Sequence, residues 1–537
     1  MRTGPGPGVW FLLGALWLAT LPLRPLFDPD EGRYAEIPRE MAASGDWVTP
    51  RLDELKYFEK PPLQYWATAT LYSAFGVHDW TARFWATALA FGCIPLVFAF
   101  VRSAGGEPAQ ATLAASLLAI NPYFALTGQL NLLDQGFSFF LTVALFAFVL
   151  AQLAPRDSAA ERNRMLLTWA ALALAVLSKG IVALVIAAGA VSIHMVVSRD
   201  ITPLKRLHAL AGVPLFLAVA APWFWLVQSR NPEFFHFFFV REHFQRFLTN
   251  VSEHVEPWWY FVPVLLIALL PFIWNVRHWK PARGGSVAAP QFDVERFLLI
   301  WCGVIFVLFS FSHSKLASYV MPIMPALAVL LARVTAAQPS AFRRAAITVA
   351  IMLLIAAAGL AVSGWERVGT LSMTAAAWAA VPIVLVAAFA WYVRARAGEN
   401  LRWPALAMLS VAGYQSLFMC YAAAFPTRSV TALTAQVAPH ISAATRLYSV
   451  GQFRHSLLFY LERPMRVFEY TGELAFGLEQ AGLGPGQRDK QQFLRDWQQE
   501  SDAIVFLNSG LYVELQSAGM PGRVIAQDAH SIVVSRS

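Results

Sequence analysis

The sequence predicts a polytopic α-helical membrane protein that ends in a small α/β domain. Of its 537 residues, 57% are hydrophobic and only 14% are charged, whereas soluble domains carry roughly 25% charged residues. Apolar runs of membrane-crossing length recur up to residue 425, and the composition changes after residue 426. We therefore expect a transmembrane domain over 1–425, with about thirteen spans, and an α/β domain over 426–537.

The first predicted span is the apolar run 9–23. One charge, Arg2, precedes it, and Leu-Pro-Leu-Arg-Pro at 21–25 does not resemble a signal-peptide cleavage site, so we expect a retained helix. The further predicted spans lie at about 81–101, 109–121, 136–153, 166–178, 181–198, 209–227, 259–275, 296–311, 316–333, 345–363, 371–392 and 404–424.

The charge distribution predicts the orientation. The net charge is +8, and most of the surplus lies in alternate short loops, such as the one with Arg343 and Arg344, which places these loops and the N-terminus in the cytoplasm. An odd number of spans then places the C-terminus outside, together with two long loops at about 27–80 and 228–258. Nucleic-acid binding is disfavoured, because no basic face lies outside the short loops.

Cofactor motifs are scarce. The three cysteines (Cys93, Cys302 and Cys420) fall in apolar spans, which disfavours a disulfide or a cysteine metal site. No Gly-rich phosphate loop, dinucleotide fingerprint or His-Glu-x-x-His motif is present, so we expect no nucleotide cofactor.

The C-terminal region has the pattern of an α/β domain. Short β-branched and aromatic runs at 447–450, 465–470, 503–507 and 531–534 predict strands. Helical patterns near 455–462 and 489–499 lie between them.

The first long loop opens with an unusual density of charge. We expect an amphipathic helix from Glu31 to Ala43, with Tyr34, Ile37 and Met41 on the membrane interface. Its charges are either simply solvated or part of a site. Three acids at its start, Asp28, Asp30 and Glu31, exceed what a helix cap requires, so Asp30 and Glu31 are candidate catalytic residues.

Further candidates lie at the predicted outer boundary. Lys60 precedes two prolines that stiffen the chain, so its charge is held at a fixed position, which suits the binding of a phosphate. A lysine that snorkels at a membrane boundary is equally compatible with this position. Asp134 is a candidate acid or a helix cap, and Lys179 is a candidate phosphate ligand or a membrane anchor.

The cations converge on one side of the membrane. The candidate substrate residues are Glu242, His243 and Arg246 of the second outer loop and Lys315 at a later boundary, where Tyr319 adds a phenol. The cations predicted on the outer side are Arg33, Lys60, Lys179, Arg241, Arg246 and Lys315. Their shared target is expected to be an anionic group, with phosphate the first candidate.

These motifs, taken together and in order, resemble the bacterial polyprenyl-phosphate-sugar glycosyltransferases of the GT-C class. The similarity is nearest to the aminoarabinose transferases of lipid A, relatives of the protein O-mannosyltransferases, and runs from about residue 10 to 425. It is carried by Asp30-Glu31-Gly-Arg33-Tyr34, Glu59-Lys60-Pro61-Pro62, Leu133-Asp134, Ser178-Lys179-Gly180, Glu242-His243-x-x-Arg246 and Ser314-Lys315-Leu-x-x-Tyr319-x-x-Pro322.

The resemblance implies a GT-C fold whose loops 27–80 and 228–258 form an active site on the periplasmic side of the inner membrane. It implies that Asp30 and Asp134 are the important aspartates. The carrier phosphate would be held by Arg33, Lys60 and Tyr319. Glu59 with Asp30 would bind a divalent cation, Zn or Mg, although no tight ligand spacing in the chain demands one.

The implied reaction moves a sugar, such as 4-amino-4-deoxy-L-arabinose, from undecaprenyl phosphate to a lipid A phosphate. The residues leave two alternatives open. A protein hydroxyl or another envelope glycan could be the acceptor, or the chain could be a lipid or solute transporter. A transporter is disfavoured because its polar groups should lie at mid-membrane, whereas these charges crowd the outer boundary.

Overall fold

The computed structural model describes residues 6–245, 255–279, 292–368, 372–394, 401–483 and 488–536. It divides into two compact units. The first contains Met1–Leu21, Glu59–Gln64 and Phe84–Ala424, and the second contains Pro22–Phe58, Tyr65–Arg83 and Phe425–Ser537. The last segment of the second unit begins at Phe425, and most of the loop 27–80 belongs with that segment rather than with the helical unit.

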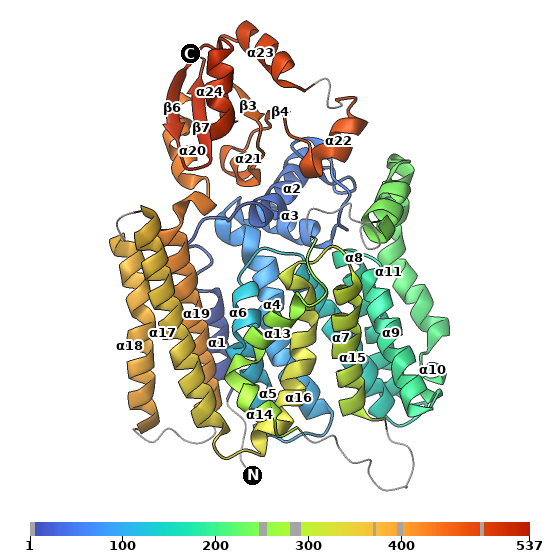
Figure 1. Ribbon diagram of the computed structural model, residues 1–537. Helices are drawn as coiled ribbons and strands as arrows, with labels where there is room; N and C mark the ends of the chain where they lie inside the picture. The colour runs from blue at the N-terminus through green and yellow to red at the C-terminus, as the bar shows by residue number, and fades with distance from the viewer. Residues whose placement is uncertain are drawn as a thin grey trace. The chain divides into compact units, whose positions relative to one another are not determined.

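Helices joined by turns and irregular segments make up the described part of the first unit (Figure 1). Its elements are α1 (Pro7–Leu18), α4 (Asp79–Ser103, beginning in the second unit), α5 (Pro108–Ile120), α6 (Pro122–Thr127), α7 (Asp134–Leu153), α8 (Ala159–Lys179), α9 (Val182–Ser198), α10 (Thr202–Lys205), α11 (Ala209–Arg230), the π-helix η1 (His236–Gln245), α13 (Phe261–Leu269), η2 (Leu270–Phe272), α14 (Ile273–Val276), α15 (Val294–Phe311), η3 (Ala317–Ile323), α16 (Met324–Ala336), α17 (Ala341–Val368), α18 (Met373–Arg394) and α19 (Arg402–Ala424).

The helices confirm a polytopic membrane protein. Within the described ranges, 8 helices are long and apolar enough to cross a membrane, and shorter apolar helices at Pro7–Leu18, Pro108–Ile120, Val182–Ser198 and Phe261–Val276 coincide with further predicted spans. The predicted span 166–178 lies within α8, whose first turns are charged. The count of thirteen stays a prediction.

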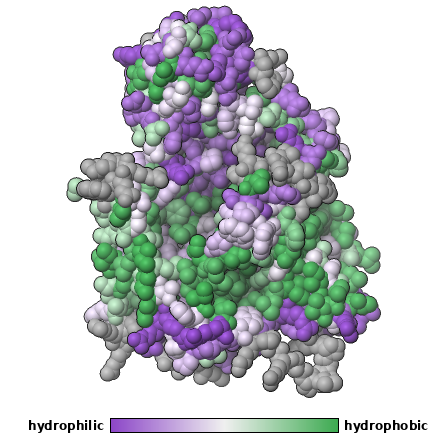
Figure 2. Space-filling model, in the orientation of Figure 1, coloured by the Kyte–Doolittle hydropathy of each residue, from purple (hydrophilic) through white to green (hydrophobic). Residues whose placement is uncertain are grey.

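The surface of the helical unit is that of a membrane protein. Figure 2 shows a belt of hydrophobic residues on its helices, bordered at one end by hydrophilic residues. Large apolar side chains of the helical unit are exposed, among them Phe311, Ile355 and Val384. Exposed apolar area on this scale requires a hydrocarbon solvent rather than water.

The second unit joins the first loop to the C-terminal region. The loop contributes α2 (Asp30–Ser44), the short hairpin β1 (Arg51–Leu52) and β2 (Leu55–Lys56), and most of α3 (Leu63–Phe75). The C-terminal region contributes η5 (Pro426–Arg428), α20 (Thr431–Val437), η6 (Ala438–His440), β3 (Arg446–Val450), α21 (His455–Leu461), β4 (Arg466–Phe468), η7 (Gly472–Leu474), α22 (Ala475–Gln480), α23 (Lys490–Gln499), β5 (Ala503–Asn508), α24 (Ser509–Ser517), β6 (Arg523–Gln527) and β7 (Ser531–Ser535).

The five strands form one mixed sheet in the order β4-β3-β5-β7-β6. β3 pairs in parallel with β4 and β5, with Tyr448 opposite Val505, whereas β7 runs antiparallel to β5 and β6. Phe493 and Trp497 of α23 and Leu515 of α24 pack on one face. All four predicted strands are confirmed. β6 was not predicted, because it is mostly exposed and lacks a buried alternation.

Helix α2 corrects the expected interfacial helix. Tyr34, Ile37 and Met41 are buried inside the second unit, so they pack on protein rather than on lipid. α2 lies against α21 so closely that a Cβ at Gly32 would come within 2.5 Å of the Ser456 backbone nitrogen. Only glycine allows this approach.

A buried ion triad sets the start of α2. Glu31 is 2% exposed and accepts from Arg24 Nη1 and Nη2 at 2.6 and 2.9 Å, and from Arg83 Nε at 3.1 Å. The Phe27 backbone nitrogen also donates to Glu31, at 3.0 Å. Burial alone would raise the pKa of Glu31, but the two guanidinium groups hold it at about 2.

Replacement of Glu31 should therefore destabilise the protein. Glu31→Ala leaves two buried guanidinium groups without their carboxylate, and we expect a loss of about 3–5 kcal/mol, measured by unfolding of the purified protein in detergent. Glu479→Ala, at an exposed carboxylate, should change stability little. The stability lost by Glu31→Ala should be greatest above pH 4.5 and should shrink as the pH falls toward 2. The reason is that a carboxyl group whose pKa is lowered by folding stabilises the folded state only while it is ionised. Equal stability of the two variants would contradict the structural role.

Candidate active site

The first unit brings together two of the predicted residues at a helix hairpin. Asp134 occupies the first turn of α7, and Lys179 occupies the last turn of α8. The two helices pack side by side, and Lys179 Nζ donates to Asp134 Oδ1 in a nearly buried ion pair. Each charge also opposes the partial charge of its own helix end, which favours this placement. The chain therefore places a paired acid and cation at one end of the hairpin.

Aromatic rings complete the surroundings of Lys179. Its Nζ lies 4.2 Å from the ring centre of Tyr319 and 5.6 Å from that of Phe137, distances at which a ring face attracts a cation. Tyr319 belongs to η3, whose first residue, Ala317, accepts a hydrogen bond from Tyr123 Oη at 2.6 Å. The predicted residues Asp134, Lys179 and Tyr319 thus form one cluster.

The segment with Glu59 and Lys60 lies in the same unit. Lys60 Nζ donates to the Glu59 backbone oxygen at 3.1 Å and lies 4.0 Å from Glu59 Oε2. Gln64 Nε2 donates to Asn131 Oδ1 at 2.9 Å. This bond ties the Lys60 segment to the turn that leads into Asp134.

The second unit holds the other predicted pair. Asp30 and Arg33 lie one turn apart on α2, with Arg33 Nη2 3.5 Å from Asp30 Oδ1. Arg33 Nε also lies 2.8 Å from Glu473 Oε2, and His455 Nε2 contacts the same carboxylate. Asp30 is 42% exposed, whereas Arg33 is 14% exposed, so the aspartate is the more accessible of the two.

Two predicted site residues are corrected by their surroundings. Glu31 is the buried carboxylate of the ion triad, so it is held by two arginines and is inaccessible to a substrate. Lys315 is also buried, and its Nζ donates to the backbone oxygens of Glu256, at 2.8 Å, and Ser312, at 2.5 Å. Burial lowers its pKa. Lys315 joins two segments of the backbone rather than presenting its charge to a ligand.

The predicted substrate loop is described in part. Glu242 lies on the π-helix η1, and the neighbouring Arg241 lies 5.3 Å from the ring centre of Phe237. Arg246 and the side chain of His243 lie outside the described residues, and their predicted contacts stay predictions.

The divalent cation also stays a prediction. Asp30 lies beside Arg33, and Glu59 lies beside Lys60, so each expected metal ligand already has a cation as a neighbour. Across the described part of the chain, no group of three or more His, Cys, Asp or Glu side chains is arranged to hold a metal ion. No step proposed below uses a metal ion.

The sequence analysis missed Glu473 and His455 beside Arg33. They follow the carboxyl ends of the parallel strands β4 and β3, the edge where ligands commonly meet α/β sheets. That rule is the signal that could have identified them.

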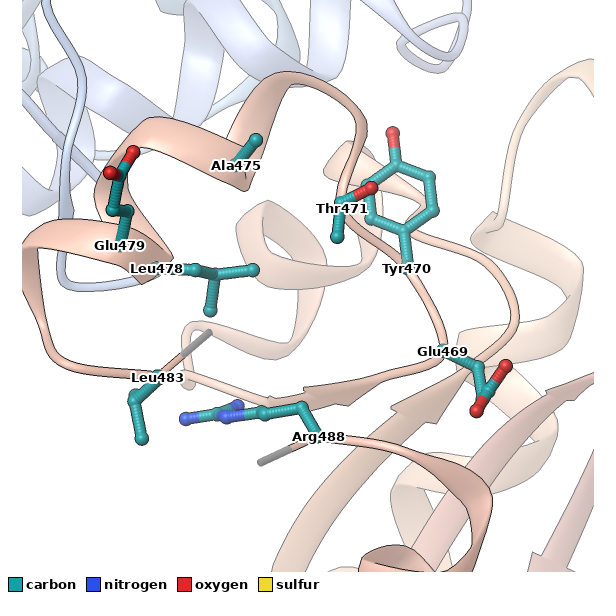
Figure 3. Close-up of a pocket in the computed structure, with 8 residues that line it drawn as sticks. All are labelled: Glu469, Tyr470, Thr471, Ala475, Leu478, Glu479, Leu483 and Arg488. Atoms are coloured by element: carbon teal, nitrogen blue, oxygen red, sulfur yellow. The ribbon is translucent and has the colours of Figure 1, made fainter. Parts of the chain in front are cut away.

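A cavity of about 620 Å³ opens near the same edge of the sheet (Figure 3). It is lined by Glu469, Tyr470, Thr471, Ala475, Leu478, Glu479, Leu483 and Arg488. Arg488 donates to the Val467 backbone oxygen at 3.0 Å. None of the predicted site residues lines this cavity.

Comparison with known proteins agrees with both regions. Residues 15–238 match the dolichyl-phosphate-mannose-protein mannosyltransferase family, and residues 433–536 match the aminoarabinose transferase C-terminal domain. The undecaprenyl phosphate-alpha-4-amino-4-deoxy-L-arabinose arabinosyl transferase of Edwardsiella ictaluri is 29% identical over 87% of each chain. The Serratia proteamaculans protein of the same name is 30% identical over 72% of this chain and 70% of its own.

Solved structures extend this similarity to the whole chain. The crystal structure of ArnT from Cupriavidus metallidurans bound to undecaprenyl phosphate has a TM-score of 0.82 and 30% identity, covering 98% of this chain and 97% of that one. The apo structure of the same protein gives a TM-score of 0.81. With this coverage and identity, the chain belongs to the aminoarabinose transferase (ArnT) family of GT-C glycosyltransferases.

Proposed function

We propose that the chain transfers 4-amino-4-deoxy-L-arabinose from undecaprenyl phosphate to a phosphate of lipid A, on the periplasmic side of the inner membrane. The observation that carries the proposal is the similarity, over nearly the full length, to a structure bound to undecaprenyl phosphate. The names of the curated relatives support the same donor sugar.

The donor chemistry requires cations. As the bond between the sugar and its phosphate breaks, negative charge grows on the departing undecaprenyl phosphate. A fixed cation stabilises such charge strongly where water is scarce. We assign this role to Arg33, Lys60 and Lys179, and we assign the phenol of Tyr319 to a phosphate contact. The carboxylates Asp30 and Asp134, close to Arg33 and Lys179, keep these cations in place before the donor arrives.

The acceptor chemistry assigns a role to Asp30. A lipid A phosphate is already anionic near pH 7, so it attacks the sugar without a strong base, and Asp30 orients it. A hydroxyl acceptor has a far higher pKa, and Asp30 would then have to act as a general base. The exposure of Asp30 suits contact with an incoming acceptor in either case.

The acceptor is tested by mass spectrometry of lipid A from cells with and without the gene. We expect aminoarabinose-modified lipid A only in cells that carry the gene. Unmodified lipid A in both strains, under every growth condition, would exclude lipid A and favour a hydroxyl acceptor.

Asp30→Asn should abolish transfer while the protein stays folded, because the amide keeps the shape of the side chain but loses its charge. The measurement is turnover by purified protein in detergent, with thermal unfolding recorded in parallel. Full turnover by a well-folded variant would make Asp30 a structural residue.

Substitution of the cations distinguishes a phosphate-binding role from a purely structural one. Arg33→Ala and Lys60→Ala each remove a charge-assisted contact worth roughly 1.5–3 kcal/mol, and we expect at least about a ten-fold loss of donor turnover. Arg156→Ala is the control, because Arg156 is 67% exposed in the loop between α7 and α8. A loss for Arg156→Ala as large as for the other two, or losses that only follow stability, would refute the phosphate site.

A further inference from the structure

We propose that a second cavity, at the opposite edge of the α/β sheet, binds a phosphorylated saccharide. The cavity measures about 400 Å³, and its lining includes Arg446, Arg463, Arg466, Arg488 and Asp53. Pockets for small ligands measure about 300–1,000 Å³, so one sugar ring with its phosphate is of suitable size. None of the candidate active-site residues lines this cavity, and the inference does not rest on the proposed transfer.

The fold gathers the arginines at the amino ends of two parallel strands. Arg446 is the first residue of β3, and Arg466 is the first residue of β4. Because β3 and β4 are parallel neighbours, these two side chains start at the same edge of the sheet. Arg463 lies in the turn that leads into β4, and Arg488 lies just before α23. Four guanidinium groups thus converge on one cavity from three segments of the chain.

Two of these arginines keep their charge available for a ligand. Among the described residues, Arg463 and Arg488 are held by backbone oxygens rather than by carboxylates. Arg463 donates to two successive backbone oxygens at 2.6 and 3.1 Å, and Arg488 donates to that of Val467 at 3.0 Å. A guanidinium carries five N–H donors, so each retains donors for a ligand. Unlike the buried Lys315, both side chains are partly exposed.

The other two arginines have carboxylate neighbours at the rim. Arg446 Nη1 lies 2.7 Å from Glu500 Oε1, and Arg466 Nη1 lies 4.0 Å from Asp496 Oδ2. Arg446 is 57% exposed and Arg466 is 50% exposed, so solvent weakens both pairs. Burial lowers the pKa of Arg488, and the charge of Arg466 lowers it further. Like charges that face one cavity favour an anion between them.

A carboxylate in the same cavity indicates that the ligand also carries a hydrogen-bond donor. Asp53 is 6% exposed, and its Oδ1 accepts from the Met465 backbone nitrogen at 2.7 Å. In the part of the chain that the structure describes, its Oδ2 has no hydrogen-bond donor. A buried carboxylate oxygen needs a donor, and it repels a ligand that is only an anion. A saccharide phosphate satisfies both groups, because its phosphate binds the arginines and a hydroxyl donates to Asp53.

The turn that delivers Asp53 is strained and held in place. Asp53 and Glu54 form the two-residue turn of the β1–β2 hairpin, with φ of 56° and 63°. Glycine and asparagine are the usual residues at such values. The carboxylate of Glu40, on α2, accepts from the backbone nitrogens of Asp53 and Glu54 at 2.6 and 3.0 Å. Strained backbone is common at binding sites, and here it places a carboxylate where the arginines converge.

The test measures binding of glucose 1-phosphate, glucose and inorganic phosphate to the full-length protein in detergent, by calorimetry at pH 8. Burial raises the pKa of Asp53 to about 7, so this carboxylate is mostly ionised at pH 8. We expect glucose 1-phosphate to bind at least about ten-fold more tightly than the other two probes, because only the sugar phosphate meets both the arginines and Asp53. Equal affinity for inorganic phosphate, or no binding of glucose 1-phosphate, would overturn the inference.

Variants locate the bound probe. Arg463→Ala and Arg466→Ala should each lower the affinity for glucose 1-phosphate about ten-fold, because each removes a charge-assisted contact. Asp53→Asn should lower the affinity for glucose 1-phosphate but raise that for inorganic phosphate. The amide can keep the bond to the Met465 nitrogen, and it presents N–H donors to the cavity in place of a negative charge. Arg495→Ala, at an exposed arginine of α23 outside the cavity, is the matched control and should change neither affinity.

Thermal unfolding of every variant is recorded in parallel. Affinity losses that only follow the unfolded fraction, or a loss for Arg495→Ala as large as for Arg466→Ala, would contradict the site. Binding that is lost in Arg33→Ala but kept in Arg466→Ala would place the probe at the proposed carrier-phosphate site and would also contradict it. Excess lipid A distinguishes two sources of the ligand. Competition with glucose 1-phosphate indicates the head group of a membrane lipid, and binding without competition indicates a soluble sugar phosphate.

Discussion

The buried carboxylate of Glu31 is the interaction on which the second unit depends. Two arginines that approach it from different segments, before α2 and at the start of α4, satisfy it together with a backbone nitrogen. An unpaired buried charge would be very costly, so this unit is stable only when the three segments meet at Glu31. Their meeting fixes where α2 begins, and hence the directions in which Asp30 and Arg33 point.

Other charges that lie beside apolar surface are paired in the same way. Lys179 is matched by Asp134 at opposed helix ends, and Lys315 by backbone oxygens. The distinction that matters for function is what the partner is. A cation bound to carbonyls, as Lys315 is, belongs to the architecture. A cation beside a carboxylate and aromatic rings, as Lys179 is, can give up part of its contact with the carboxylate and bind a phosphate instead.

The sequence predicted the elements of this protein better than their partners. Hydropathy identified the membrane-spanning class and most of the spans, and β-branched runs identified four of five strands, because both are local properties. The site was predicted as a set of residues, and Asp134, Lys179 and Tyr319 do meet. The misassigned residues, Glu31 and Lys315, look like site residues by charge alone. Only their tertiary neighbours, which no local pattern records, make them structural. The sequence did not identify Glu473 for the same reason.

The separation along the chain between Asp28 and its partner Arg454 has a consequence for biosynthesis. The two residues are 426 positions apart, and ribosomes add roughly 5–20 residues per second. The Glu31 triad lies wholly within the first 83 residues, so it can assemble early. The contact of Asp28 with Arg454 forms only when the 426th residue after Asp28 has been added, which takes about 20–85 s. During this interval every later span is inserted while the partner surface of α2 does not yet exist. A truncated chain that lacks its last segment would thus carry a complete membrane domain, but Arg33 would lack its contact with Glu473.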